Sequence, residues 1–290
     1  MIWTVGSLAL LAAGVGSRCA GVLEQTLRQE RRLQARYIAL AGVQSCLQAL
    51  DTDTSPSYDG LSETWAHSGL VDEDRKINLN KAPPDVLRRL LAAAGAVEAD
   101  QDVIVDSIAD WRDKDHEKGP YGAESFYYLG LDPAYECKDG PFESIEELLF
   151  VRGMTPELFS VISPSVTVHG SGRVNLNTAG PDVLRALGLS EQGVQGILFY
   201  QAGEDNQPGT PDDRALSAIS AAGAELAQYI PAEDIARLAQ LDAAALVGVK
   251  SQDFAFDITG RVNEDEQGRD GVRLIGVMDR KGKVKAWAER

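Results

Sequence analysis

Carboxylate side chains are concentrated in one glycine-containing stretch near the middle of the chain. The sequence Asp110-Trp-Arg-Asp-Lys-Asp-His-Glu117 is followed by Gly119 and Gly122-Ala-Glu124, and these residues place several carboxylates in a loop that follows an expected helix. Calcium takes six to eight oxygen ligands from flexible loops of this kind, in which glycines allow backbone carbonyls to turn inward. The spacing is not that of an EF-hand. The residues alone therefore leave two interpretations open, a calcium site and a solvated acidic loop.

The sequence contains no arrangement typical of a catalytic site. The three histidines, His67, His116 and His169, are scattered, without the spacing of a metal site or a catalytic triad. Glu146 and Glu147 are adjacent on an expected helix, where neighbouring side chains do not face each other. We therefore expect a protein that is not an enzyme and, where it binds a metal, one that uses oxygen ligands.

The three cysteines, Cys19, Cys46 and Cys137, form no CxxC motif and no regular framework. Cys46 and Cys137 fit two descriptions, buried free thiols or a single disulfide. A disulfide would require an oxidising compartment.

The charge of the chain argues against binding to a nucleic-acid backbone. The chain has 44 acidic and 28 basic residues, a net charge of −16. Binding to phosphates requires clustered Lys and Arg side chains. The composition therefore favours a folded protein that repels nucleic acid or attracts divalent cations.

One pattern keeps a DNA-binding alternative open. Residues 141–159 read as a helix–hairpin–helix: Ser144 begins a capping box, Gly153 ends the first helix, and Thr155 begins the second. Related hairpins in DNA-uptake proteins bind phosphates through backbone N–H groups and nearby basic residues. Here Arg152 is the single basic residue of the hairpin and lies among glutamates, so the local charge disfavours DNA.

A sequence unit occurs twice in the interior of the chain. Residues 77–90 and 174–187 are identical at ten of fourteen positions, at an offset of 97 residues. Each copy predicts a short strand with alternating apolar residues, followed by a helix that begins at Pro84 or Pro181. The interior is therefore expected to be a tandem array. We expect Asn78, Asn80, Asn175 and Asn177 to satisfy backbone groups of loops and helix starts.

The amino-terminal residues predict a membrane segment. Residues 1–17 carry no charge, and Arg18 is then the first residue at the membrane–water boundary. Because a spanning helix needs about 20 apolar residues, we expect a transmembrane segment at 1–18 that is incomplete at its start. Residues 19–50 continue with helical spacing and charged residues, as an amphipathic extension. Burial of the whole segment in a globular core fits poorly with the sharp change in polarity at Arg18.

The carboxyl-terminal end changes to a pattern of period two. This predicts three consecutive antiparallel strands at 254–262, 272–278 and 284–287. Earlier strands are expected near 64–67 and 75–77. The expected organisation is a loop with first strands at 51–81, an inserted α-helical domain at 82–251 and antiparallel strands at 252–290. This is an α+β chain whose small sheet is interrupted by a large helical insertion.

The order of these motifs resembles a known family. A long helix that leaves the membrane, followed by a sheet with a helical insertion, is similar to the pseudopilins of type II secretion, above all the minor pseudopilin general secretion pathway protein K. The segments that carry the resemblance are 76–82, 108–115, 122–128, 141–154, 174–179 and the three final strands. The amino terminus departs from the family, because no basic leader stands before the apolar run.

The resemblance implies a pilin-like fold and a structural role. The protein would stand at the tip of the periplasmic pseudopilus with other minor pseudopilins and help to initiate its assembly for protein export. Its further partner would be the inner-membrane assembly platform, without nucleic acid. It would cross the inner membrane once, with most of the chain in the periplasm.

The resemblance also implies calcium in the helical domain. On the matching motif, the residues expected to bind the ion are Asp113, Asp115 and Glu124. Asp110 is expected to cap the loop or to pair with an arginine instead.

Overall fold

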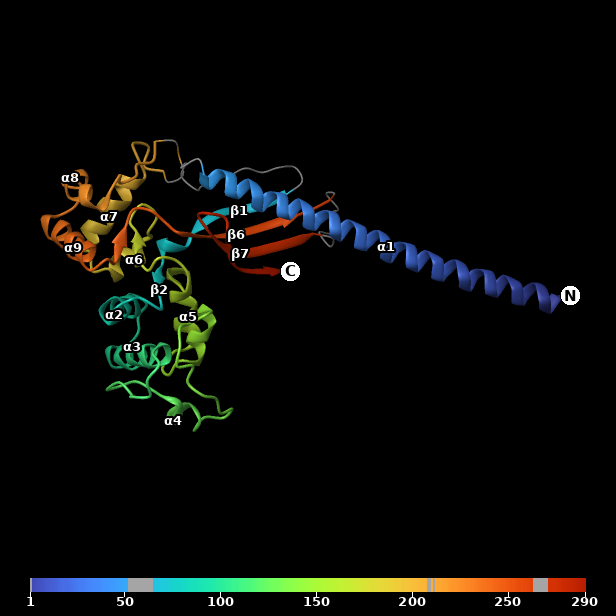
Figure 1. The fold of residues 1–290 in the computed structure, drawn as a ribbon, viewed down its shortest axis with the longest axis horizontal. Coiled ribbons are helices and arrows are strands. Elements are labelled where there is room, and N and C mark those ends of the chain that lie inside the picture. The colour runs from blue at the N-terminus through green and yellow to red at the C-terminus, as the bar shows by residue number, and fades with distance from the viewer. Residues whose placement is uncertain (1, 52–64, 208–209, 211, 263–270) are drawn as a thin grey trace. The chain divides into compact units, whose positions relative to one another are not determined.

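The computed structural model describes residues 2–51, 65–207, 210, 212–262 and 271–290 (Figure 1). Within these ranges the side chains of residues 2–14, 16–17, 48–51 and 65–69 are not described. The described chain divides into two compact units. Unit 1 contains Met1–Val71 and Ala255–Arg290, and unit 2 contains Asp72–Phe254.

Unit 1 combines a long helix with most of a four-stranded sheet. Helix α1 covers Ile2–Asp51, and the strand order of the sheet is β1-β6-β7-β8. Strands β7 and β8 pair in antiparallel orientation. The strands span Trp65–Asp72 (β1), Asp253–Gly260 (β6), Val272–Asp279 (β7) and Val284–Glu289 (β8).

A stripe of small residues allows α1 to pack against the sheet. Ala35, Ala39, Gly42 and Cys46 are buried at spacings of four, three and four residues, which place them on one helix face. A Cβ at Gly260 of β6 would collide with the backbone oxygen of Ala35, so the two backbones are close. The C-terminal half of α1 runs along the strands in Figure 1, and its N-terminal half extends beyond them.

Unit 2 consists of two halves, each of which begins and ends with a short strand and has helices between the two strands. The first half runs from β2 to β3, and the second from β4 to β5. In each half the two short strands pair in parallel, Ile77 with Val166 and Val174 with Val247. The short helix η1 (Glu73–Arg75) precedes the first half. The elements of the first half are β2 (Ile77–Asn78), α2 (Pro84–Ala93), α3 (Glu98–Arg112), α4 (Ser125–Tyr128), η2 (Ile145–Phe150), α5 (Pro156–Ile162), η3 (Ser163–Ser165) and β3 (Val166–Thr167). Those of the second half are β4 (Val174–Asn175), α6 (Pro181–Ala186), α7 (Glu191–Gln201), η4 (Ile219–Ala221), α8 (Ala222–Glu225), α9 (Ala232–Ala243) and β5 (Val247–Gly248).

The repeated sequence unit forms the centre of unit 2. Both copies are a short strand followed by a helix with proline at its start, as predicted. The two helices α2 and α6 pack against each other, and Arg89 Nε donates to the backbone oxygen of Ala186 at 2.9 Å. One apolar core runs through both halves, with members from Ile77 to Val247.

The paired asparagines hold equivalent positions in the two halves. Asn80 accepts from Phe142 N at 2.7 Å and donates to Phe142 O at 2.9 Å. Asn177 accepts from Leu216 N at 2.8 Å and donates to Leu216 O at 3.1 Å. The prediction that these asparagines satisfy backbone groups is therefore confirmed.

Several sequence predictions can be compared with these elements. The three carboxyl-terminal strands are confirmed, and β1 contains the strand expected near 64–67 over its described residues. The expectation that Ile77 belongs to the first sheet is wrong, because β2 pairs with β3 inside unit 2. The helix expected to begin at Ser144 has its capping box, but it is a 3₁₀ helix of six residues. The polar loop expected after Asp51 lies outside the described residues from position 52 to 59.

The two ends of unit 2 are held together by buried acidic side chains. Asp72 Oδ2 accepts from Asn175 Nδ2 at 2.9 Å and from the Ser251 hydroxyl. Asp74 accepts from the backbone of Ser171 and of Gln252, each at 2.7 Å. Burial raises the pKa of Asp74, while these hydrogen bonds oppose the rise. The network joins residues near the start, the middle and the end of unit 2.

Candidate metal centre

The end of helix α3 sets the position of the acidic loop. Asp113 is the C-cap of α3, and its N–H donates to Ala109 O at 3.1 Å. Trp111, two residues earlier, is buried against the rings of Tyr128 and Phe142. The buried tryptophan anchors the end of the helix, so the carboxylates that follow begin from a fixed point.

Asp110 shapes the loop from inside. Its two carboxylate oxygens accept from Gly119 N at 3.0 and 3.2 Å. A Cβ at Gly122 would collide with the same carboxylate, so glycine is required there. Asp110 therefore caps the loop backbone, one of its two expected roles, and it does so without an arginine among the described contacts.

The structure brings Asp113, Asp115 and Glu124 together. One carboxylate oxygen from each lies within 4.8 Å of the others. Two oxygens that bind one calcium ion at 2.3–2.6 Å can be at most about 5 Å apart, so this spread is compatible with a shared ion. The three residues named from the sequence thus form a cluster, and ion binding by it stays a prediction.

Two further residues lie at the cluster and were missed from the sequence. Ligand atoms of His116, Glu124 and Asp139 form a second group within 4.8 Å, and His116 Nδ1 is 3.3 Å from Asp139 Oδ2. Asp139 has a φ of 50°, which few non-glycine residues adopt. The dipeptide Asp139-Gly140 is a turn signal, but its place beside a loop 15 residues earlier depends on the tertiary fold.

Several carboxylate oxygens of the cluster are buried and have no hydrogen-bond partner in the described part of the chain, although the Asp115 side chain is exposed. Among the described residues, Asp113 Oδ1, Asp139 Oδ1 and both oxygens of Glu124 have no hydrogen-bond partner. Burial raises the pKa of Glu124, and the charges of Asp110, Asp139 and Asp113 raise it further. Burial also raises the pKa of Asp113, followed by the charges of Asp115 and Asp139. A buried group of like charges without donors is costly unless a cation compensates it.

The donor set fits calcium better than zinc. Carboxylate oxygens are hard ligands, and the loop backbone can supply further carbonyls. A structural zinc site would normally include cysteine or several histidines, and this cluster contains one histidine. Asp113, Asp115, Glu124 and Asp139 could therefore hold a calcium ion that neutralises their repulsion.

A second acidic loop, at 203–213, is organised by its own hydrogen bonds. Asp212 Oδ2 accepts from the N–H groups of Glu204 and Asp205 at 2.6 and 3.0 Å. These donors lower the pKa of Asp212 to about 2 together with Thr210, whose hydroxyl is the largest cause. This carboxylate therefore already has partners, unlike those of Glu124.

The structure weakens the DNA-binding alternative. The hairpin between η2 and α5 has Gly153 at φ 86°, as the helix–hairpin–helix pattern requires. Its basic residue, Arg152, donates to Gly122 O at 3.1 Å and lies over the Tyr127 ring at 4.7 Å. The side chain that would contact a phosphate is therefore engaged within the protein.

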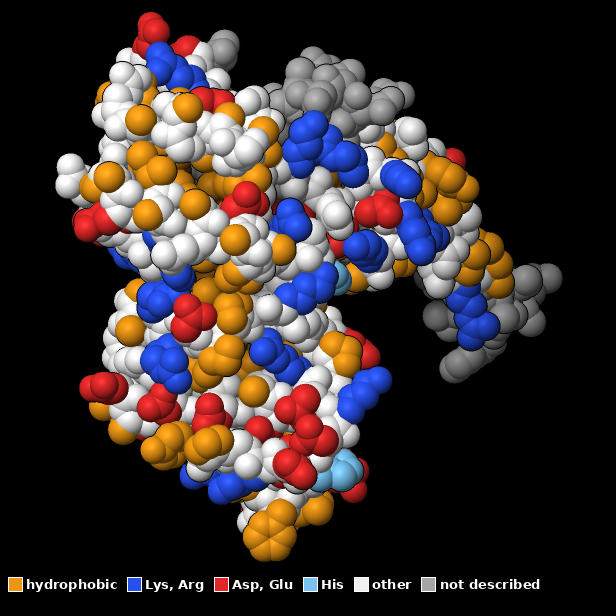
Figure 2. All heavy atoms as spheres, turned by 60° about the vertical axis from the view of Figure 1, so that its left-hand side comes forward, with side chains coloured by type: hydrophobic (Ala, Val, Ile, Leu, Met, Phe, Trp, Pro, Cys, Tyr) orange, Lys and Arg blue, Asp and Glu red, His pale blue; other side chains and the backbone are white. Residues whose placement is uncertain are grey.

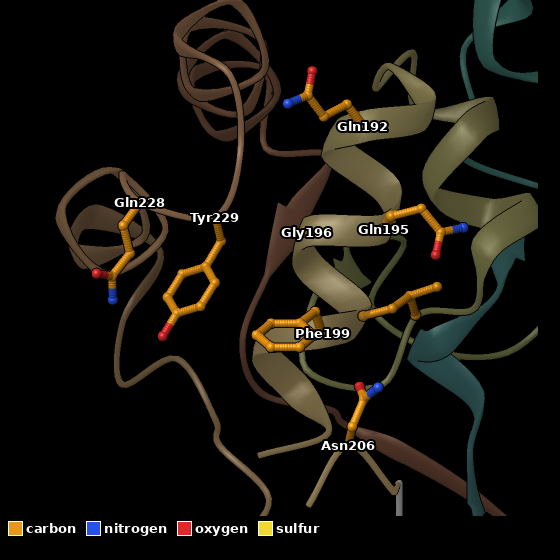
Figure 3. A pocket seen from close by; sticks show the side chains of 8 residues that line it. Gln192, Gln195, Gly196, Phe199, Asn206, Gln228 and Tyr229 are labelled. Carbon is orange, nitrogen blue, oxygen red and sulfur yellow. The ribbon is translucent and has the colours of Figure 1, made fainter. Parts of the chain in front are cut away.

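A separate pocket lies in the second half of unit 2 (Figure 3). Its volume is about 540 Å³, and it is lined by uncharged residues of α7, of the loop at Asn206 and of the segment 228–229. The rings of Phe199 and Tyr229 are 6.0 Å apart in its wall. Without carboxylates in its lining, this pocket is not part of the acidic cluster.

Comparison with known proteins shows similarity to one family. Residues 68–171 match the family described as Type II secretion system (T2SS), protein K. Proteins named Type II secretion system protein K are similar in sequence: that of Klebsiella pneumoniae is 26% identical over 206 residues, and that of Aeromonas hydrophila is 32% identical over 160 residues. These matches cover 60% and 52% of this chain, and 63% and 44% of the relatives, so the chain spans about half to two thirds of their length.

The fold is shared with a solved secretion protein. A chain in the crystal structure of the GspK-GspI-GspJ complex from the enterotoxigenic Escherichia coli Type 2 Secretion System has a TM-score of 0.66, at 18% identity. The match covers 94% of this chain and 99% of that chain. The two chains thus share an α+β fold with a long helix, an antiparallel sheet and a helical insertion. Over the matched residues, the chain is similar to proteins of the type II secretion system protein K family.

The predicted membrane segment stays a prediction. Within the part of the chain that the structure describes, no helix has both the length and the apolar character needed to cross a bilayer. The side chains of the predicted segment 1–18 lie outside the described residues except at positions 15 and 18.

Cys19, Cys46 and Cys137 are all free thiols, and the last two are buried.

Proposed function

We propose that this chain is a minor pseudopilin of a type II secretion system, at the tip of the periplasmic pseudopilus, where it helps to initiate assembly for protein export. The observation that carries the proposal is the fold, a 50-residue helix and a small sheet with unit 2 inserted between β1 and β6. The similarity to the protein K family supports it. The helix and sheet would join the fibre, and unit 2 would be too large for another subunit to stack above it.

The proposed partners are homologues of GspI and GspJ, which form a complex with the solved relative. The exposed part of α1 supports an association of this kind. Its apolar side chains Val22, Leu23, Leu27 and Leu33 are exposed within unit 1. A helix with such a surface requires a partner, and a bundle of similar helices would provide one. The amino-terminal segment would anchor the chain in the inner membrane and bring it to the assembly platform.

Calcium is proposed as the bound ion of unit 2, at Asp113, Asp115 and Glu124 with Asp139. The ion would tie the loop 113–124 to the segment 137–140. Its role would be structural, because it would replace the missing donors of the buried carboxylates.

Copurification tests the assembly proposal. The full chain carries an affinity tag and is coexpressed with the GspI and GspJ homologues of the same organism. We expect both to be recovered with the wild-type chain, and recovery to fall about tenfold for Leu27→Glu/Leu33→Glu, since charge on the helix surface opposes packing. The matched control Gln25→Glu/Gln34→Glu adds the same charge to exposed polar positions of α1 and should keep recovery within about twofold. Absence of both partners from the wild-type chain would refute the proposal.

A further inference from the structure

An aromatic patch is exposed at the end of unit 2 that carries α4. We use this name for seven large apolar residues on two neighbouring segments. Phe126 is 95% exposed, which is unusual for phenylalanine in a folded unit. The full set is Tyr121, Phe126, Tyr127, Leu129, Leu131, Leu149 and Phe150.

Ring contacts show that the two segments of the patch are continuous. Tyr127 packs on Tyr128 at 5.2 Å, Tyr128 on Tyr135 at 5.2 Å, and Tyr135 on Phe150 at 5.7 Å between ring centroids. The Tyr135 hydroxyl donates to Phe150 O at 2.8 Å. The exposed rings therefore rest on a fixed base, which reduces the conformational entropy that binding would cost.

The fold does not account for the exposure of these side chains. Tyr128 and Trp111 are buried and fill the local core. Tyr127, next to the buried Tyr128, is 37% exposed. Phe126, on the four-residue helix α4, follows Glu124 by two positions and belongs to no described ring contact. An exposed apolar surface of this extent is typical of an interaction site.

The charge around the patch defines the kind of partner. Residues 113–152 contain ten acidic and four basic side chains. Unit 2 as a whole has 31 acidic and 15 basic residues, whereas unit 1 has 13 of each, so unit 2 carries the entire net charge of −16. Figure 2 shows hydrophobic and acidic side chains next to each other at the lower end of the visible face, the end that carries α4 in Figure 1. A partner must therefore offer apolar side chains together with lysine or arginine.

We infer that the aromatic patch binds a basic amphipathic segment of another protein. Phe126 and Phe150 supply the apolar anchors, and the surrounding carboxylates attract the basic residues and exclude acidic segments. The same carboxylates repel an anionic lipid surface, which makes a membrane the less favoured partner. This inference does not depend on the proposed place at the pseudopilus tip.

The test uses the full chain and model peptides. A fluorescent peptide of about 18 residues places leucine on one helical face and lysine on the other, and its binding is followed by anisotropy. Two matched peptides replace leucine by serine or lysine by glutamate. We expect at least about tenfold weaker binding for either control peptide, because both apolar contact and opposite charge are needed.

Variants locate the binding site. Phe126→Ser/Phe150→Ser removes two exposed rings and should weaken binding of the leucine–lysine peptide at least about tenfold. The control Val161→Ser/Phe199→Ser removes two exposed apolar side chains elsewhere in unit 2 and should change binding less than about twofold. Circular dichroism and thermal unfolding check that both variants keep the fold.

Several outcomes would overturn the inference. Equal weakening by the two double variants would show that the patch is not the site. If the peptide with serine in place of leucine binds as tightly as the original peptide, charge attraction alone accounts for the binding. A third outcome concerns lipid. If the chain sediments with vesicles of phosphatidylcholine and phosphatidylglycerol only when Phe126 and Phe150 are present, while peptide binding does not depend on these residues, the patch binds lipid instead.

Discussion

At the scale of single residues, the acidic cluster differs from other acidic segments because buried oxygens of its carboxylates have no hydrogen-bond donors within the residues that the structure describes. Glu124 is buried, and neither of its oxygens has a hydrogen-bond partner among the described residues, whereas Asp212 in the other acidic loop accepts several bonds. Both loops are acidic and contain glycine, so composition alone does not separate them. The two loops differ because Glu124 is buried near the end of α3 and because Asp139, 15 residues later in the sequence, lies beside it.

We predict that calcium binds this cluster. Titration calorimetry of the metal-free full chain should show binding heat that Asp113→Asn/Glu124→Gln removes, since two ionised ligands are lost. Calcium at about 100 times its dissociation constant should raise the free energy of unfolding by about 2.7 kcal/mol in the wild type. Without calcium, the same variant should be more stable than the wild type, because the carboxylate repulsion is relieved.

The matched control changes two acids at the other end of α3. Glu98→Gln/Asp100→Asn alters charge equally on the same helix, and both side chains are exposed. It should bind calcium as the wild type does. Asp139→Asn tests the residue that sequence reasoning missed and should weaken binding about tenfold or more. Equal heats for the wild type and Asp113→Asn/Glu124→Gln would remove the site.

At the scale of elements, the sequence was sufficient to predict helices and strands whose boundaries depend on neighbouring residues. Proline at the first helical position, the capping box of Ser144 and the period-two pattern of the final strands all predicted elements that the structure contains. The parallel pairing of β2 with β3 was not predictable, because strands of two residues carry no register signal. For the same reason Ile77 was assigned to the wrong sheet.

The repeat extends further in structure than in sequence. The repeated sequence unit covers residues 77–90 and 174–187, yet Phe142 and Leu216, which lie outside it, exchange the same pair of hydrogen bonds with Asn80 and Asn177. These bonds use backbone groups, which every residue offers. Partner residues can therefore diverge while the asparagine stays the same.

We predict that the two asparagines are equally important for stability. Asn80→Ala and Asn177→Ala should each lower the free energy of unfolding by about 2 kcal/mol, since each leaves a backbone N–H and a carbonyl without its partner. Gln192→Ala, at an exposed position of α7, is the control and should change stability by less than about 0.5 kcal/mol. Urea unfolding of unit 2 measures all three, and a neutral effect of either asparagine variant would contradict the equivalence of the halves.

At the scale of the whole molecule, the two units differ in charge and in core. Unit 2 has the net charge, and its apolar core consists of residues from Ile77 to Val247, all within its own bounds. Its ends are joined by Asp72 and Asp74, which accept bonds from Asn175, Ser171 and Gln252. A unit with its own core and connected ends can be inserted between two strands without disturbing their pairing.

We predict that residues 72–254 fold without the rest of the chain. The excised segment should give a helical circular dichroism spectrum and a single cooperative urea transition, because its core is complete. A shorter segment, 77–249, keeps the core but lacks Asp72, Asp74 and Gln252. It should be less stable by about 2–4 kcal/mol, since the partners of those carboxylates are left without acceptors. Equal stability of the two segments would show that the buried acids do not hold the ends together, and a non-cooperative transition of 72–254 would show that unit 2 depends on the sheet and α1 to fold.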